Sequence, residues 1–570
     1  MLFCTINDFS AYGNLSGYTT KGKKACPICE ENTHLIWLTN CKKLTFMGHQ
    51  RELAENHPYR KKSDLFDGTI EDRKLPPPLD GETTLSKVEN INVVLGKKGF
   101  GPPKGIWKKK SIFWKLPYWK HLRVQHCPDV MHIEKNVCES FIGLLLSIPR
   151  KTKDGIKIRT YMEIMNIRPE LQPKDIEGYS ANIRKLVSMK DLKLLGMKSH
   201  DCHILMTQMI PIAIRGILPN RIRHTITKLC LFFNIIHSKV IDPDVLDEYQ
   251  RDIILTLCEL KIYFPPSFFD VVVHLVSHIV GEIKACGPVF LRYMYPFERY
   301  MGILKGYVRN LNQPEGSIVE GNASEEVIEF CTNYMDRFKS AGIPQSQHEG
   351  RISGQGTLGR MTGYSNVADY HEAHFTVLQH TTSIDLYIQE HMSLLRQENQ
   401  WLKDKVRRTL PNIDKTVEAL GFAPKHVFQY QGYDINGYTF YTKDQDKKSK
   451  TQNSGVTVIA SSTEFTIVNR EERSRIAKKS HYGFIQEIWE LHYGSYTIPL
   501  FKCKWVDNDR GVQVDEDGFT TVNLSTNGYN EEPFILAKIV TQVFFIEDPK
   551  DCRWHVVAWK TMDCWCRERC

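Results

Sequence analysis

Features that would place this chain in a membrane or outside the cell are missing from its sequence. The most apolar stretches, such as Phe268 to Val280, are broken by His or charged residues. They are therefore shorter than the roughly 18 residues that a membrane span needs. The first ten residues, MLFCTINDFS, carry no basic leader and too short an apolar run for a signal peptide. The 16 cysteines lack the dense, regular spacing of a secreted disulfide scaffold. We therefore predict an intracellular protein.

Internal repeats are also absent, because no period of about 20 to 50 residues recurs, and this excludes solenoids and propellers. The composition, 41% hydrophobic and 25% charged, is that of a folded protein. A chain of 570 residues exceeds one ordinary core, so roughly three to four domains are expected. The net charge of +9 is modest for this length, so the local distribution of charge says more about partners.

Acidic residues are missing from one segment, the basic-aromatic stretch between Lys97 and Arg123. Aromatic residues alternate there with nine cations, which are Lys97, Lys98, Lys104, Lys108, Lys109, Lys110, Lys115, Lys120 and Arg123. Cations of this kind neutralise phosphates, and exposed aromatic rings stack on splayed bases. The other interpretation is that the aromatic rings belong to the core and the lysines form a solvated face. Composition alone favours neither.

A small module rich in Cys, His and Gly follows the first predicted strand. Cys26-Pro-Ile-Cys29 is a C-x-x-C pair, which places two thiolates on one side of a tetrahedral metal ion. His49 and His57 are the predicted remaining ligands for structural zinc, although their separation is wider than the usual H-x(3–5)-H. His34 and Cys41 compete for these positions, and a metal-free loop is the alternative. No nearby Glu stands out as a base, which argues against catalytic zinc.

The pattern along the chain predicts helices in its middle. The segment from about Val130 to Tyr334 is mostly helical in pattern, with Asp242-Pro243 as the start of one helix. Ser267 is predicted to begin the next helix, and Gly287 to follow its end. The first residues read as a buried strand that ends at Asp8, ahead of a glycine-bearing loop.

The last part of the chain reads as strands with Gly turns and aromatics, typical of a small β-barrel or sandwich. The predicted strands are Phe484 to Tyr493, Tyr496 to Trp505, Gly518 to Leu524, Gln542 to Ile546 and Trp554 to Trp559. A Gly, Ser and Thr-rich linker precedes a short helix in which Ile388, Leu395 and Leu402 recur every seventh residue. This short seam is weak support for self-association.

Several carboxylates could carry chemistry. Asp8 at a strand end and Glu298 on a helix suit a site where carboxylates hold two divalent cations for phosphodiester chemistry. Lys305 lies seven residues after Glu298, near the same helical face, where it could meet a phosphate. Asp129 and His132 are three residues apart at the predicted start of a helix. Asp129 could be the helix cap with His132 one turn further on, or the two residues could support such a metal site. His200, Asp201 and His203 have two interpretations. They could ligate a metal ion, or an Asp or Ser cap could lie beside two packed histidines.

Eight long segments resemble the large transposase of plant CACTA (En/Spm) DNA transposons. They are INDFSAYGNLSGYTTKGKKACPIC (Ile6 to Cys29), FMGHQRELAENHPYRKK (Phe46 to Lys62), LPYWKHLRVQHCPDVMHIEKNVCES (Leu116 to Ser140), NIRKLVSMKDLKLLGMKSHDCHILM (Asn182 to Met206), PPSFFDVVVHLVSHIV (Pro265 to Val280), MYPFERYMGILKGYVRNLNQPEGSIVEG (Met294 to Gly321), GFIQEIWELHYGSYTIPLFKCKWVD (Gly483 to Asp507) and EPFILAKIVTQVFFIEDPKD (Glu532 to Asp551). The last two resemble a β module at the end of the same proteins.

The resemblance implies an α+β multidomain fold, with a fragment of a ribonuclease-H-like domain, a large helical insertion and a small C-terminal β-rich domain. It implies a Mg²⁺- or Mn²⁺-dependent Asp-Asp-Glu site for DNA strand cleavage and transfer. The second catalytic Asp would fall on Asp8, the Asp-x-x-His motif on Asp129 and His132, and the catalytic Glu on Glu298, with Glu320 as a weaker substitute. Expected partners are DNA at the transposon termini, and the expected location is the nucleus.

The resemblance also implies a domain order. We expect a truncated catalytic region with the Cys/His module and the basic-aromatic stretch (1–135), a helical insertion with the catalytic-Glu helix (136–345), a linker (346–380), a helix and linker region (381–480) and a barrel-like β domain (481–560). The family's first catalytic Asp should precede Asp8, so this chain is expected to be N-terminally truncated and inactive. A non-catalytic nucleic-acid or protein binding module is the alternative.

Overall fold

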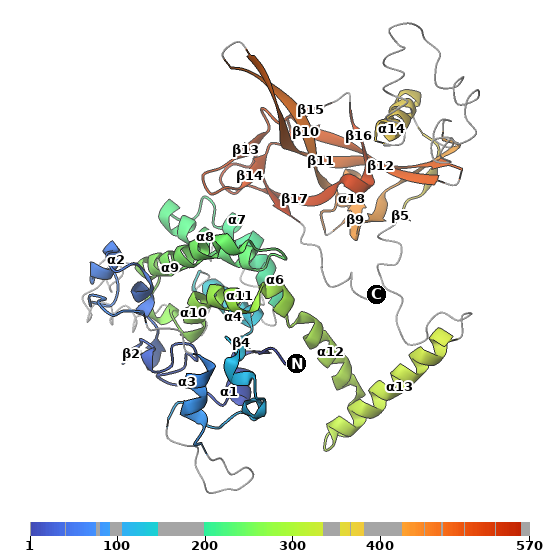
Figure 1. Cartoon of the computed structure of the whole chain (residues 1–570). Helices are drawn as coiled ribbons and strands as arrows, with labels where there is room; N and C mark the ends of the chain where they lie inside the picture. Colours follow the sequence, from blue (N-terminus) through green and yellow to red (C-terminus); the bar gives the residue numbers. More distant parts are fainter. Residues whose placement is uncertain are drawn as a thin grey trace. The chain divides into compact units, whose positions relative to one another are not determined.

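The computed structural model describes twelve stretches of the chain, which are residues 2–39, 41–75, 80–91, 105–145, 199–334, 354–364, 366–380, 424–449, 451–468, 471–494, 496–529 and 532–559. The chain divides into two compact units, Met1–Val308 and Arg309–Cys570. Each unit is described by itself (Figure 1). Both helices and sheets are present, so the fold is mixed α+β. Among the described helices, none combines the length and apolarity needed to cross a membrane.

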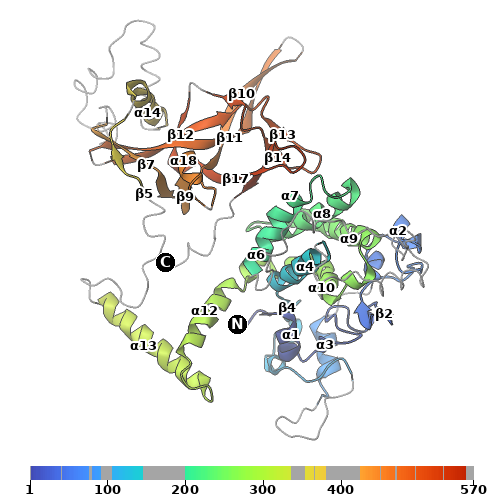
Figure 2. The ribbon, with the colours of Figure 1, turned by 180° about the vertical axis from the view of Figure 1, so that it is seen from behind.

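The first unit is mainly helical and carries short strands near its start. Its strands are β1 (Thr5–Asn7), β2 (Ile36–Leu38), β3 (Lys43–Thr45) and β4 (His126–Pro128). Its helices are α1 (Phe9–Ser16), α2 (Pro58–Lys61), α3 (Gly81–Val88), α4 (Val130–Leu145), α6 (Ser199–Ile204), α7 (Ile210–Ala213), α8 (Asn220–Ile236), α9 (Leu246–Tyr263), α10 (Val271–Leu275), α11 (Ile279–Cys286) and α12 (Tyr295–Tyr307). Figures 1 and 2, which view the ribbon from opposite sides, agree that α8 and α9 run side by side.

β1 and β4, each followed directly by an Asp, pair in parallel. β1 and β4 align Asn7 with Pro128, so Asp8 and Asp129 follow the carboxyl ends of adjacent strands. Each acid then begins a helix. Asp8 accepts a hydrogen bond from the Ala11 amide at 2.6 Å and caps α1, where a glycine-bearing loop was predicted. The polar cap explains the difference, because its carboxylate stabilises the first turn of a helix. The helix ends at Gly17, whose φ of 85° suits glycine.

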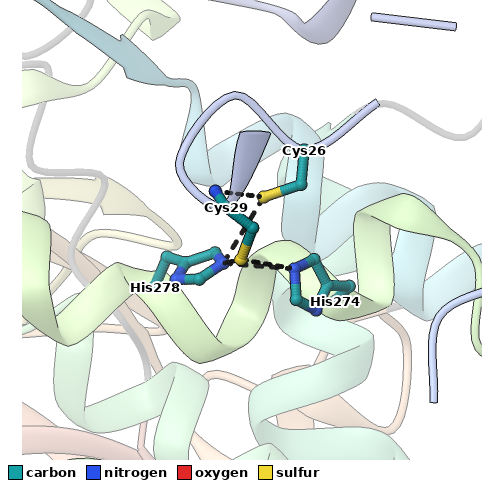
Figure 3. Close-up of side chains that lie close together, drawn as sticks. All are labelled: Cys26, Cys29, His274 and His278. Atoms are coloured by element: carbon teal, nitrogen blue, oxygen red, sulfur yellow. Dashed lines mark hydrogen bonds between the residues drawn. The ribbon is translucent and has the colours of Figure 1, made fainter. Parts of the chain in front are cut away.

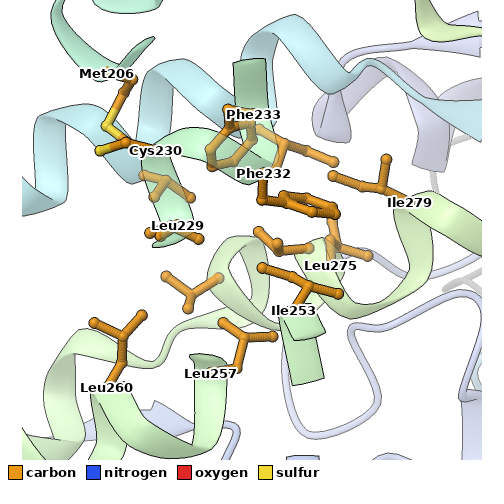
Figure 4. Packing of buried hydrophobic residues seen from close by; sticks show 14 of the residues in the cluster. Met206, Leu229, Cys230, Phe232, Phe233, Ile253, Leu257, Leu260, Leu275 and Ile279 are labelled. Atoms are coloured by element: carbon orange, nitrogen blue, oxygen red, sulfur yellow. The ribbon is translucent and has the colours of Figure 1, made fainter. Parts of the chain in front are cut away.

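Helices α8 to α11 bury their apolar faces in one core (Figure 4). Phe233 and Leu257 are fully buried in it, and Leu275 is 1% exposed. Asp242 caps the turn that leads into α9, as predicted. The predicted start at Ser267 is wrong, because Asp270 provides the cap: its Oδ1 accepts from the Val272 and Val273 amides at 3.0 and 3.1 Å.

The second unit is built on β-sheets. Its helices are α13 (Pro314–Tyr334), α14 (Val367–Gln379) and α18 (Lys443–Asp446). Its strands are β5 (Gln355–Leu358), β6 (Met361–Thr362), β7 (His426–Tyr430), β8 (Gly432–Ile435), β9 (Tyr438–Tyr441), β10 (Gly455–Val468), β11 (Glu471–Tyr493), β12 (Tyr496–Val506), β13 (Val512–Val514), β14 (Thr520–Val522), β15 (Asn527–Gly528), β16 (Phe534–Leu536), β17 (Thr541–Glu547) and β18 (His555–Trp559).

Eleven of these strands form one sheet whose main path runs from β13 to β15. Within the described residues this path stays open, so the predicted small barrel or sandwich does not appear as a closed barrel. The long antiparallel pairing of β10 with β11 explains the difference, since it extends one hairpin along the sheet. The five strands predicted from alternating apolar residues are confirmed as β11, β12, β14, β17 and β18. The predicted seam of Ile388, Leu395 and Leu402 lies outside the described residues.

Candidate metal centre and carboxylate site

The carboxylate site, which we define as Asp8, Asp129, His132 and Glu298, lies at the carboxyl ends of β1 and β4. The backbone amide of Asp129 donates to the Asn7 carbonyl at 2.6 Å, which ties the two strand ends together. Asp129 Oδ1 also accepts from the Met131 amide at 3.0 Å and so begins α4. Carboxyl ends of adjacent parallel strands are where open α/β sheets bind ligands. The location therefore suits a binding site.

His132 joins the three acids. Its Nδ1 lies 2.6 Å from Asp129 Oδ2, and its Nε2 lies 3.5 Å from Glu298 Oε1 on α12. The hydrogen bond with Asp129 raises the pKa of His132 and, against the effect of burial, the charges of Asp129, Glu298 and Asp8 raise it further. Residues from three distant parts of the chain therefore act on one imidazole.

The site is open rather than closed. Asp129 is buried, whereas Asp8 and Glu298 are exposed to solvent. In the part of the chain that the structure describes, these acids are not among the groups whose donor atoms all lie within 4.8 Å of one another. Glu320, the weaker substitute for Glu298, lies on α13 in the second unit and is exposed.

The Cys–His cluster, which we define as Cys26, Cys29, His274 and His278, is closed and mostly buried (Figure 3). Cys29 Sγ lies 3.4 Å from Nε2 of both His274 and His278, and Cys26 Sγ lies 3.5 Å from Nε2 of His278. The two Nε2 atoms are 3.2 Å apart. His274 and His278 are four residues apart on the helical segment that begins with α10, so their rings project from the same face.

Two thiols and two imidazoles are the donor set of structural zinc sites. A hydrogen bond from Cys26 and, against the effect of burial, the charge of His278 lower the pKa of Cys29 well below that of an ordinary thiol. Zinc binds the thiolate form, so these residues fit the ion. All four ligand positions of a tetrahedral ion would be filled by protein atoms.

The histidines predicted to complete this cluster lie elsewhere, which corrects the ligand set. His49 is fully buried and its ring centroid is 5.5 Å from that of His274, so it packs beside the cluster. His57 caps α2, where its Nδ1 accepts from the Tyr59 amide at 3.1 Å. The reason for the difference is the fold of the helical region, which returns α10 to the Cys pair. The signal that could have pointed to His274 and His278 is their H-x(3)-H spacing on a predicted helix.

A third group of donors, Glu134, His203 and His237, lies in the helical core. The sequence singled out His203 only together with His200 and Asp201, and neither of those belongs to the group. Glu134 and His237 carry no motif that identifies them in advance. Their carboxylate and imidazole meet only because α4 and the end of α8 pack together.

The basic-aromatic stretch is partly described, and Lys97, Lys98 and Lys104 lie outside the described residues. Trp119 is fully buried, and Trp107, which is partly exposed, packs edge-on against Tyr18 with ring centroids 5.1 Å apart. Trp119 is therefore a core residue, whereas the other described rings of the stretch are partly exposed and both interpretations remain open for them. The remaining predicted DNA contacts, Lys108, Lys109, Lys110 and Lys305, are partly or fully exposed.

A pocket of about 960 Å³ opens beside the Cys–His cluster. Cys29 and His278 form part of its wall, together with the basic side chains of Lys120, Arg123 and Lys284. Lys120 and Arg123 belong to the basic-aromatic stretch. The same wall also carries five carboxylates, which are Glu30, Glu52, Asp80, Glu82 and Glu282. The pocket is therefore mixed in charge, and its lining does not by itself favour an anionic ligand.

Three family models match parts of the chain. The model described as transposase family tnp2 matches residues 1–91, and two domains of unknown function, DUF4218 and DUF4216, match residues 236–347 and 489–557. These domains are typical of plant transposase-derived proteins. No curated protein and no solved structure matches the chain. The tnp2 segment contains Asp8 and the Cys pair, and the DUF4218 segment contains Glu298 and the His pair. Each of the two sites therefore combines residues from both matched segments.

Proposed function

We propose that this chain, whose first 91 residues match the tnp2 transposase model, is a transposon-derived DNA-binding protein of the plant CACTA (En/Spm) type. Its first unit would be the frame of a ribonuclease-H-like site for metal-dependent cleavage and transfer of DNA strands. The observation that carries this proposal is His132, which contacts Asp129 and Glu298 and whose pKa is raised by the charge of Asp8 as well. The exposure of Asp8 and Glu298 leaves room for an ion and a DNA backbone.

Asp8 and Glu298 would hold Mg²⁺ or Mn²⁺. When bound, the ion would lower the pKa of a water or DNA 3′-hydroxyl and stabilise charge at the phosphate. Asp129 has another task, because its two oxygens are already engaged by the α4 amide and by His132. It would hold the imidazole in place, and the raised pKa of His132 favours a cation beside the phosphate.

The Cys–His cluster would hold structural zinc. It fixes the loop after α1 to the α10 region, and so sets the spacing between the start of the chain and the segment that leads to Glu298. With two thiolates and two imidazoles the site leaves no position for a substrate. Its role would therefore be to support the carboxylate site.

DNA would be held by charge rather than by reading of bases. Lys108, Lys109, Lys110 and Lys305 would neutralise phosphates. The expected substrate is DNA at transposon termini, and the expected location is the nucleus.

Catalysis by this chain alone is not expected. Asp129 is engaged by His132 and the start of α4, which leaves Asp8 and Glu298 as ligands, and two carboxylates leave one position of a two-ion site under-coordinated. This favours a second candidate function, a binding module that keeps the DNA contacts without the chemistry.

Two assays with the full chain test these proposals. Fluorescence anisotropy with a random-sequence duplex should report binding that weakens steeply with salt. Incubation with supercoiled plasmid and Mn²⁺ should give no nicking. Absence of binding at low salt would contradict a DNA-binding protein of any kind. Nicking that vanishes in Asp8→Asn would contradict the inactive state and establish the enzyme.

A further inference from the structure

Glu134, His203 and His237, the Glu–His cluster, come from three helices of the first unit. Glu134 lies on α4, His203 on α6 and His237 at the end of α8. His203 Nδ1 lies 3.1 and 3.0 Å from Oε1 and Oε2 of Glu134, and His237 Nε2 lies 3.2 Å from Oε2. Their donor atoms all lie within 4.8 Å of one another. Glu134 is 1% exposed, so its charge needs a partner within the protein.

Of the two ring nitrogens of His237, Nδ1 has a hydrogen-bond partner in the described part of the chain and Nε2 has none there. Its Nδ1 lies 2.6 Å from the hydroxyl of Tyr293, and that hydroxyl donates to the His237 carbonyl at 3.2 Å. When the hydroxyl proton points to that carbonyl, Nδ1 donates its own proton to the Tyr293 oxygen. Nε2 is buried and makes no hydrogen bond within the described residues, although it faces the Glu134 carboxylate. A lone pair directed at a carboxylate is unfavourable unless a proton or a metal cation lies between them, and the metal test below separates these two occupants.

The arrangement has the other marks of a metal site. Two imidazoles and one carboxylate are the protein ligands of open zinc sites and of 2-His-1-carboxylate iron sites. The contact between Tyr293 and Nδ1 orients the ring from behind, as outer hydrogen bonds do for metal-bound histidines. Directly after α6 the chain forms a π-helical turn, Leu205–Met209, and such turns are frequent at functional sites.

We propose that Glu134, His203 and His237 bind a divalent transition-metal ion, with Zn²⁺ as the best fit to this donor set. The site is separate from the Cys–His cluster and from the carboxylate site. An ion there joins α4, α6 and α8, and through Tyr293 it fixes the segment that precedes α12. Since α4 carries His132 and α12 carries Glu298, the ion has a positioning role for the carboxylate site.

The test is the metal stoichiometry of the purified full chain after removal of metal and reloading with Zn²⁺ or Co²⁺. The wild type is expected to bind two tight equivalents. Only one of them, at the Cys–His cluster, should give thiolate-to-cobalt charge-transfer absorption. His237→Asn and His203→Gln should each lose one equivalent and keep that absorption unchanged. His224→Asn, at an exposed position of α8, is the matched control and should retain both equivalents.

Three outcomes would overturn the proposal. The first is a wild type that binds a single equivalent, lost in Cys29→Ser, and this result needs no folded cluster variant. The second is a His237→Asn chain that retains both equivalents. The third is a second equivalent that adds thiolate absorption, which would assign it to the three neighbouring thiols of Cys4, Cys127 and Cys286. None of these outcomes bears on DNA binding, so the two proposals fail separately.

Discussion

The Cys–His cluster and the carboxylate site both join the start of the chain to the region between residues 265 and 300, yet they differ in almost every physical respect. The cluster is mostly buried, and the contacts between its sulfur and nitrogen donors are 3.4 to 3.5 Å, with the two Nε2 atoms 3.2 Å apart. The carboxylate site contains two exposed acids, and His132 stands between its Asp129 and Glu298.

This difference indicates a division of tasks. A closed set of four protein ligands has no position for a substrate, whereas catalytic ions keep a position open. The cluster can therefore form before any ligand arrives. The open carboxylates repel one another without an ion, so their final arrangement depends on metal and DNA. Each of the following predictions changes one side of the comparison.

The largest effect is expected at the closed site. Cys29→Ser should remove zinc from the Cys–His cluster and abolish cooperative unfolding of the first unit. The reason is that structural zinc contributes apparent binding free energies of about 10–16 kcal/mol, which become folding free energy. Metal analysis and calorimetry measure both effects. Cys41→Ser, a partly exposed neighbour, is the control and should change neither. A stable, zinc-loaded Cys29→Ser chain would contradict the assignment.

The next effect concerns DNA binding by the basic-aromatic stretch. Replacing Lys108, Lys109 and Lys110 by Ala should reduce the slope of log affinity against log salt by up to about 2.7, since each phosphate contact contributes ~0.9. Anisotropy titrations at several salt concentrations measure the slope.

The control for this change removes equal charge elsewhere, at the exposed residues Lys61, Lys62 and Lys74. Its slope should stay near that of the wild type. If both triple variants give the same slope, only net charge matters and the basic-aromatic stretch is a solvated face.

A smaller effect is expected in the pKa of His132, followed by NMR of ring-labelled histidine. Asp129→Asn should lower it, because the hydrogen bond and charge of Asp129 raise the pKa in the wild type. Asn also caps helices well, so α4 should persist.

The sign of the pH dependence follows from the raised pKa. The stabilisation from His132 is fully present below its ordinary value of about 6.5 and is lost as pH rises through the higher folded pKa. The stability advantage of wild type over Asp129→Asn should therefore shrink above neutrality. Equal pKa values in the two proteins would remove Asp129 as the partner.

The smallest effect is expected at the histidine that the sequence favoured. His57→Asn should leave the zinc content unchanged and alter the stability by at most about 1 kcal/mol, because Asn can also cap α2. Loss of one zinc equivalent in this variant would restore His57 as a ligand and refute the observed cluster.

The sequence predicted the local features of both regions better than it predicted which distant residues the fold brings to them. The C-x-x-C pair, the cap at Asp242 and five late strands depend on neighbouring residues, and all are found in the structure. The histidine ligands were misplaced because His49 lies near in sequence, whereas His274 arrives through the folding of some 200 further residues. Asp8 and Glu298 were identified by resemblance rather than by local pattern. The aromatic rings near Trp119 were ambiguous, since composition does not show which side faces solvent.

The central claim is that Asp8 and Glu298 hold one divalent ion next to the hydrogen-bonded pair of Asp129 and His132. Iron-directed cleavage tests it most directly, because Fe²⁺ with ascorbate and peroxide cuts the backbone only where the ion binds. In zinc-saturated protein the account predicts cuts near all three acids, suppressed by excess Mg²⁺ and all lost in Asp8→Asn. Cuts near Glu298 that persist in Asp8→Asn, or no cuts at any of the three, would contradict it.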